Sequence, residues 1–243
     1  MPTEQQPLPS LPYRLIDQET QDVLLTADDL RGFFIAEDLD TQQTLMLAGV
    51  QSCDARVRRT ETALLQVLDH QGEPIGEYYL GRARLTPSAP DGHLTLQGYT
   101  CAYPRAGEIW RRWASAEPLP YGEWARHPVD WHESWLHVVQ NAWFTGGHRA
   151  ARYGTDETVT LDGRLLTTGA GFYCALGEAV NGPGGYFGSN LDALDDCLRG
   201  SRAAPAFRIE WAHFPHSRRA LGERFMTSLL RLFAEFRIEV RQR

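Results

Sequence analysis

The sequence predicts a two-domain protein: a mostly antiparallel β domain, either a small barrel or a sandwich with Trp-rich helices, followed by an α/β domain with a small parallel sheet. Up to about residue 103, short strand-like runs are separated by turns rich in Gly, Pro and Asp. After residue 158, strand-like and helix-like segments alternate, which is typical of a parallel sheet packed by helices. We expect domains at residues 1–150 and 158–243, with a linker between them.

Five runs of apolar residues predict the strands of the first domain. In the last of these runs, Leu94 and Leu96 alternate with polar residues, which is the pattern of a strand with one buried face. Turn-forming residues lie at positions 70–74 and 87–92. The predicted strands cover residues 13–17, 44–50, 62–69, 77–85 and 93–103.

Two helices are predicted next, over residues 106–116 and 128–144. Pro128 suits the first position of a helix, Trp131 and Trp135 recur at helical spacing, and Gly146 and Gly147 end the pattern. We attribute the high density of Trp before residue 150 to core packing. A cleft for a small molecule is the alternative.

The C-terminal segments predict an order of strand, helix, Gly-rich loop, helix, strand, long amphipathic helix and strand. The amphipathic segment from Arg219 to Phe236 places Phe225, Leu229 and Phe233 on one side. The predicted positions are residues 158–163, 171–180, 182–188, 190–198, 207–211, 219–236 and 237–240.

Composition excludes several kinds of chemistry. The chain has 243 residues with 24 basic and 31 acidic side chains, and all of the basic ones are Arg. Without Lys there is no Schiff base and no Walker A phosphate loop. A G-x-S-x-G nucleophile motif is absent as well. We therefore predict that the protein is not an enzyme, although an unrecognised activity in the first domain is the weakest of three hypotheses.

No cofactor or metal is expected. Cys53, Cys101, Cys174 and Cys197 form no C-x-x-C pair, so they are interpreted as buried thiols in a reducing compartment. Three histidines recur every five residues, a spacing that cannot direct them to one metal from one helix, and we expect them to be surface or capping residues. They are His127, His132 and His137.

The composition of the first residues and the hydropathy of the chain predict a cytoplasmic location. The first twelve residues hold an acidic side chain and several prolines where a signal peptide has basic and apolar segments. No segment approaches the roughly 18 apolar residues that cross a bilayer.

The most informative segment is residues 182–200, a Gly-rich loop followed by a helix that Ser189 or Asn190 caps. Apolar and acidic residues occupy opposite faces of this helix. The loop does not match the G-x-G-x-x-G phosphate motif, because Phe187 stands at its third Gly position, and carboxylates at the positive helix end repel phosphate. The acidic residues are Asp192, Asp195 and Asp196.

This acidic face predicts a surface that imitates a polyanion and binds a cationic protein; a solvated acidic face with no partner is the alternative. The charge is local, since residues 158–243 hold 9 acidic and 11 Arg side chains.

The run YFGSNLDALDDCLRG at residues 186–200 resembles the barstar family, the intracellular inhibitors of barnase-type ribonucleases. A strand with a Gly turn before it, a strand ending in Ile-Glu-Trp after it and a Leu-x-Leu-Phe-x-Glu sequence in the last helix agree with the family. The resemblance covers residues 158–243 and implies the family's α/β fold and its inhibitory function.

The resemblance also implies a set of partner-binding residues. Tyr186 and Gly188 match loop positions of the family, Asp192 and Asp196 match the two aspartates that enter the ribonuclease cleft, and Glu235 matches an outlying acidic contact. Three positions depart from the family pattern: Phe187 replaces a tyrosine, Ser189 a glutamate and Asp195 a tryptophan. The predicted partner-binding set is Tyr186, Phe187, Gly188, Asp192, Asp195, Asp196 and Glu235.

The first hypothesis is thus a ribonuclease inhibitor with an immunity or self-protection role. The second is a non-catalytic adaptor that uses the same acidic surface to bind another cationic protein. Neither needs direct contact with nucleic acid or membrane.

Overall fold

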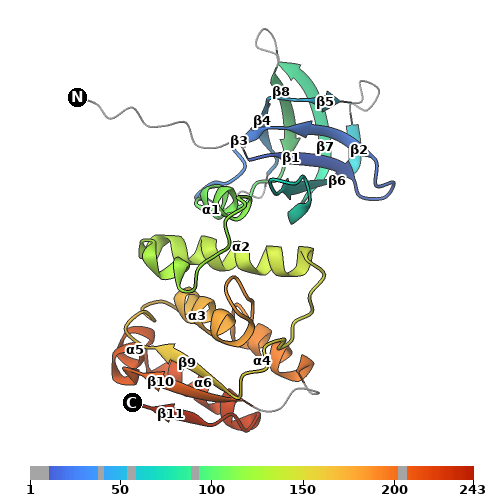
Figure 1. Cartoon of the computed structure of the whole chain (residues 1–243). Helices are drawn as coiled ribbons and strands as arrows, with labels where there is room; N and C mark the ends of the chain where they lie inside the picture. Colours follow the sequence, from blue (N-terminus) through green and yellow to red (C-terminus); the bar gives the residue numbers. More distant parts are fainter. Residues whose placement is uncertain (1–10, 38–40, 54–58, 89–92, 202–206) are drawn as a thin grey trace, which may run out of the picture. The chain divides into compact units, whose positions relative to one another are not determined.

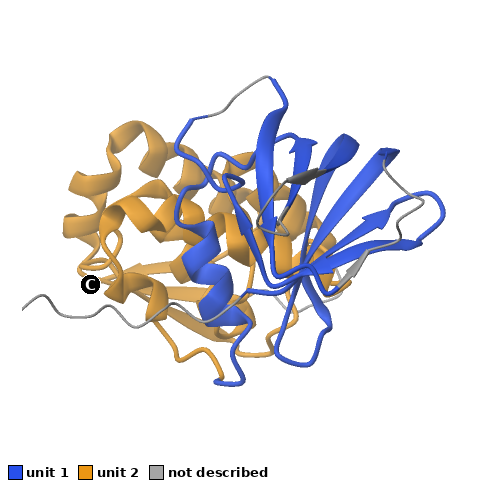
Figure 2. Ribbon diagram, turned by 90° about the horizontal axis from the view of Figure 1, so that it is seen from above, with its two compact units in different colours: residues 1–117 blue, residues 118–243 orange. Residues whose placement is uncertain are grey.

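The computed structural model describes residues 11–37, 41–53, 59–88, 93–201 and 207–243 (Figure 1). The chain forms two compact units, Met1–Glu117 and Pro118–Arg243 (Figure 2). Within the described ranges, no helix is both long and apolar enough to cross a membrane.

The first unit contains one sheet of eight strands in the order β3-β4-β8-β7-β6-β1-β2-β5. Every neighbouring pair of strands in this sheet is antiparallel, which confirms the predicted class of the N-terminal region. Three short strands that were not predicted, β2, β3 and β5, complete the sheet. The strands are β1 Tyr13–Asp17, β2 Val23–Ala27, β3 Asp29–Arg31, β4 Gln43–Ala48, β5 Ser52–Cys53, β6 Arg59–Leu68, β7 Pro74–Ser88 and β8 His93–Gly98.

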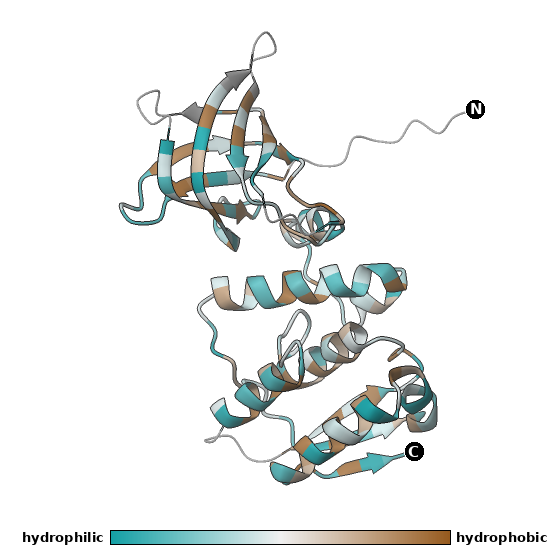
Figure 3. Ribbon diagram, turned by 180° about the vertical axis from the view of Figure 1, so that it is seen from behind, coloured by the Kyte–Doolittle hydropathy of each residue, from teal (hydrophilic) through white to brown (hydrophobic). Residues whose placement is uncertain are grey.

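Alternation along the strands builds the core of this unit. Leu45 and Leu47 are fully buried, whereas Met46 between them is 38% exposed. Figure 3 shows the same alternation of apolar and hydrophilic residues along the strands of this sheet. The following helix, α1 (Ala106–Trp113), adds Trp110, whose indole N–H donates to the Tyr78 hydroxyl at 2.7 Å. Burial raises the pKa of Tyr78 well above its ordinary value.

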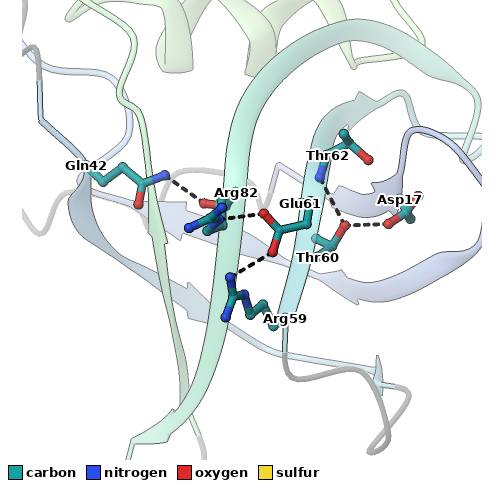
Figure 4. A network of polar contacts seen from close by, with 7 residues as sticks. All are labelled: Asp17, Gln42, Arg59, Thr60, Glu61, Thr62 and Arg82. Carbon is teal, nitrogen blue, oxygen red and sulfur yellow. Dashed lines mark hydrogen bonds and ion pairs between the residues drawn. The ribbon is translucent and has the colours of Figure 1, made fainter.

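A polar network ties strands β1, β6 and β7 together at the surface (Figure 4). The carboxylate of Glu61 lies 2.8 Å from the Arg59 guanidinium and 2.6 Å from that of Arg82. These cations, Arg82 above all, lower the pKa of Glu61. The hydroxyl of Thr60 donates to Asp17. The network therefore spans the place where the β6–β7 register shifts, between residues 60 and 63.

The second unit has a three-stranded parallel sheet in the order β11-β10-β9, with α-helices before and between the strands. This confirms the predicted α/β class of the C-terminal region. Its elements are η1 Glu123–Arg126, η2 Val129–Trp131, α2 His132–Thr145, β9 Thr158–Asp162, α3 Gly169–Asn181, α4 Leu191–Gly200, β10 Arg208–Ala212, α5 Phe214–Leu221, α6 Glu223–Glu235 and β11 Val240–Gln242.

Residues 118–150, predicted to be part of the N-terminal domain, lie in the second compact unit. The backbone N–H of Gly122 and the indole N–H of Trp124 both donate to the Glu178 carboxylate on α3, each at 3.0 Å. The His132 ring on α2 lies 3.0 Å from the Thr168 hydroxyl at the start of α3. These contacts attach the segment to α3.

The expected linker is also bound to this unit. The Asn181 side chain accepts hydrogen bonds from the backbone N–H groups of Tyr153 and Gly154, at 2.7 and 3.2 Å, and the backbone N–H of Arg152 donates to Ser201 at 2.7 Å. The chain between α2 and β9 is therefore held along its course.

Three local expectations were wrong. His132 is only 4% exposed, because it packs against Trp124 and Thr168 and is not a surface residue. The segment from Arg219 to Phe236 forms two helices, because Gly222 has a φ of 83° that ends α5 and precedes α6. The last strand begins at Val240, since Arg237 has a φ of 57° and cannot be part of a strand.

Three cysteines, Cys101, Cys174 and Cys197, are buried free thiols, as expected. Burial raises the pKa of Cys101 and Cys197 to about 12 and that of Cys174 well above its usual value. All three are therefore held as unreactive thiols. The side chain of Cys53 lies outside the described residues.

Because His137 on α2 is partly buried, we expect the protein to lose stability in acid. Desolvation lowers its pKa from 6.5 to about 4, so the unfolded chain binds a proton that the folded chain excludes. The stabilising contribution of neutral His137 to the free energy of unfolding is fully present above pH 6.5 and is lost as the pH falls toward 4. Between these pH values, the wild type should lose about 2–3 kcal/mol more unfolding free energy than His137→Gln.

Urea denaturation at several pH values measures this difference. His216→Gln, which changes an exposed histidine on α5, is the matched control and should keep the wild-type dependence. Parallel curves for His137→Gln and the wild type would show that His137 does not carry the effect.

Candidate protein-docking site

The Gly-rich loop, residues 182–188, is seated directly on α3. A Cβ at Gly177 would lie 2.2 Å from the carbonyl oxygen of Gly185, so only Gly at position 177 admits the loop at this distance. The Asn181 side-chain amide donates to the Tyr186 carbonyl at 2.8 Å. The loop is thereby positioned before α4 begins.

Three predicted partner-binding residues lie in the interior of this loop. Tyr186 is 2% exposed and its ring contacts that of Phe144 on α2, with centroids 5.4 Å apart. Phe187 is fully buried. Gly188 has a φ of 99°, and a Cβ there would lie 2.8 Å from the Leu194 backbone. In this arrangement the three residues hold the start of α4 and do not face solvent.

Helix α4 begins after Asn190, one of the two predicted cap residues, and its apolar and acidic residues lie on opposite faces. The backbone N–H of Ala193 donates to the Asn190 side chain at 2.8 Å, which identifies Asn190 as the cap. Leu194 and Leu198 are buried, whereas Asp192 and Asp196 are exposed. The opposite faces therefore match the sequence pattern.

A groove between α4 and α6 brings all four predicted acidic residues together. Its volume is about 450 Å³. Glu235 is more than thirty residues from the other three in sequence, and the packing of α6 beside α4 places it in the same groove. The groove is lined by Leu191, Asp192, Asp195, Asp196, Arg199, Ser228, Arg231, Leu232 and Glu235.

Two arginines that were not among the predicted site residues also line this groove. Arg199 binds Asp195 through two hydrogen bonds of 2.5 and 3.0 Å, and this carboxylate raises the pKa of Arg199. Arg231 lies 3.3 Å from Glu235. Both pairs have the i,i+4 spacing of helix ion pairs, so the sequence did contain the signal.

The remaining carboxylates carry the free charge of the groove. Among the described residues, no ion pair involves Asp192 or Asp196. Four carboxylates and two guanidinium groups leave a net charge of −2 in the groove. In the described part of the chain, no cluster of three His, Cys, Asp or Glu side chains is placed to hold a metal ion. This arrangement is suited to binding a cationic surface by charge.

A substitution at Gly177 tests how far the stability of the protein depends on the packing of the loop against α3. Gly177→Ala should lower the free energy of unfolding by about 1–3 kcal/mol, because the new methyl group overlaps the Gly185 carbonyl and displaces the loop. Gly169→Ala, at the start of the same helix, has nothing within 4 Å of the new carbon and should leave stability nearly unchanged. Urea denaturation of both variants compares them directly; equal stabilities would refute the packing argument.

Comparison with known proteins finds a family match for part of this unit. No curated protein matches the chain. The family model Barstar, described as Barstar (barnase inhibitor), matches residues 157–243. The match includes the parallel sheet, the Gly-rich loop and both helices of the acidic groove, and it leaves out α2 and the first unit. Residues 157–243, the C-terminal third of the chain, are therefore a domain of the Barstar family.

Proposed function

We propose that this protein inhibits a barnase-type ribonuclease by placing the acidic surface of α4 and α6 against the nuclease's cationic active-site cleft. One observation carries the proposal: Asp192, Asp196 and Glu235, from two helices, converge on a single surface. The match to a family described as barnase inhibitors supports the same assignment.

The inhibitory mechanism follows from the charge of the two surfaces. A ribonuclease lines its cleft with cations that bind the phosphates of RNA. The α4 carboxylates take the place of those phosphates, and because the inhibitor offers no scissile bond, the cleft is occupied without reaction. Opposite charges also speed the encounter at low salt. The chain itself contributes no catalytic group in this proposal.

Ion pairing determines which carboxylates of the groove carry free charge. Arg199 holds Asp195 in place and neutralises it, so the free charge for a partner lies on Asp192 and Asp196. We assign these two residues the principal contacts and Glu235 an outlying one.

In this proposal, the main role of the loop residues is to position α4. Tyr186, Phe187 and Gly188 set the direction of α4 from beneath the surface. Phe144 lies over Tyr186 and is 45% exposed, so it would present an aromatic side chain to the partner at this place. Such aromatic residues frequently anchor protein interfaces.

We further propose that the inhibitor works in the cytoplasm as an immunity protein. An inhibitor protects RNA only in the compartment that holds the RNA, so this assignment rests on the proposed inhibition of a ribonuclease.

Asp196 tests the proposal most directly. Asp196→Ala should weaken inhibition of a barnase-type ribonuclease by about 2–5 kcal/mol, because the nuclease cations then lie buried without a partner. Titration of the nuclease against the wild type and the variant, with a fluorogenic RNA substrate, measures the change. Glu223→Ala removes an exposed charge at the far end of α6 and should inhibit like the wild type.

Two outcomes would contradict the proposal. Equal inhibition by Asp196→Ala and the wild type would remove Asp196 from the interface. A wild-type protein that inhibits no such nuclease would favour the adaptor hypothesis, in which the same groove binds another cationic protein.

Replacing Arg199 should strengthen the attraction of the groove to a cationic partner, whereas replacing Asp196 should weaken it. Arg199→Ala frees the Asp195 carboxylate and makes the groove more negative, so association with a cationic nuclease should become faster, with a steeper dependence on salt. Stopped-flow association rates at several salt concentrations measure both effects. Arg218→Ala, which breaks an exposed pair with Glu223 outside the groove, is the control. Slower association for Arg199→Ala would mean that Arg199 itself contacts the partner.

A further inference from the structure

A hollow of about 370 Å³ in the second unit is lined by residues of β9, of α3 and of the segment around η1. Trp124, Leu161 and Leu166 are buried and form its walls. At its rim, Tyr121 is 59% exposed and Leu165 is 44% exposed. A hollow of this volume with apolar walls has the size of a site for a small organic molecule.

One buried carboxylate, that of Glu178 on α3, lines this apolar hollow. It accepts hydrogen bonds from the backbone N–H of Gly122 and the indole N–H of Trp124, each at 3.0 Å, and from the backbone of Gly184. An ionised carboxylate has about four acceptor positions. These three neutral donors therefore leave one acceptor position of Glu178 open.

The charge of Glu178 has no counter-ion in the described part of the chain. Among the described residues, no ion pair includes Glu178, and no Arg or His lines the hollow. Asp162, the second carboxylate of the lining, is already paired with Arg164 at 2.6 Å. Burial raises the pKa of Glu178, and the negative charge of Glu123 raises it further. A cation in the hollow would lower the cost of this buried charge.

We propose that this hollow binds a small organic cation, an ammonium group attached to an apolar or aromatic body. The ammonium donates a hydrogen bond to the open acceptor position of Glu178, and the body lies against Trp124 and Leu161. The face of an indole ring also attracts a cation. Among the described residues, none lines both this hollow and the acidic groove, so the binding does not depend on the proposed function.

Isothermal titration calorimetry of the full chain tests this site with phenethylammonium and with 2-phenylethanol, a neutral compound of the same shape. We expect a dissociation constant below about 1 mM for the ammonium compound. The alcohol should bind about tenfold more weakly or worse, because it supplies no counter-charge to Glu178. Equal affinities for the two compounds overturn the proposal, and so does the absence of binding up to about 10 mM phenethylammonium.

Substitutions at three positions locate the bound ammonium compound. Ala175→Leu extends a side chain from α3 into the hollow and should abolish the binding of phenethylammonium. Asp196→Ala in the acidic groove and Ala220→Leu, an exposed change on α5, should bind it like the wild type. Wild-type binding by Ala175→Leu, or loss of binding by Asp196→Ala, would place the compound outside the hollow and overturn the proposal.

Glu178→Gln tests the role of the carboxylate charge. This variant keeps the shape of the side chain and removes its charge, so its affinity for phenethylammonium should fall to that for 2-phenylethanol. A folded Glu178→Gln protein that still prefers the ammonium compound as the wild type does would overturn the assignment. If Glu178→Gln does not fold, as judged by circular dichroism, the two compounds on the wild type and on Ala175→Leu decide the question.

Discussion

The second unit depends on one buried carboxylate. Glu178 on α3 is 5% exposed, and it accepts hydrogen bonds from Gly122 and Trp124 on one side and from the Gly184 backbone on the other. Burial raises its pKa, and a buried carboxylate is tolerated only when its oxygens are hydrogen-bonded. Glu178 thus joins the segment before α2, the helix α3 and the Gly-rich loop. The acidic helix follows that loop, so its direction depends on the same contact.

The acidic groove illustrates how local charge differs from the charge of a domain. Residues 158–243 carry more Arg than acidic side chains, yet the α4–α6 groove has a net charge of −2. Helix spacing explains the difference, because Asp192, Asp195 and Asp196 share one face of α4 while most of the arginines lie on other elements. At physiological salt, charges more than about 8 Å away are largely screened. A partner therefore responds to the groove and not to the whole domain.

The segment before the family match contacts elements that lie inside the match. α2 lies outside residues 157–243, but Phe144 from this helix contacts Tyr186 in the loop. His132 from the same helix occupies the space above Gly171 on α3, where a Cβ would lie 3.0 Å from its ring. α2 is consequently part of the structural unit that carries the groove, and it limits which loop side chains reach solvent.

By itself, the sequence determined the class of both regions, most strands and helices, the approximate start of α4 and the acidic face of that helix. These features follow from local periodicity, from Gly and Pro, and from short-range hydrogen bonds. Only the tertiary structure decided that residues 118–150 pack with α3, that Tyr186 and Phe187 are buried, and that Glu235 joins the α4 aspartates. Each of these depends on contacts between residues far apart in the chain. Burial and convergence are properties of packed surfaces, which periodicity along one segment does not specify.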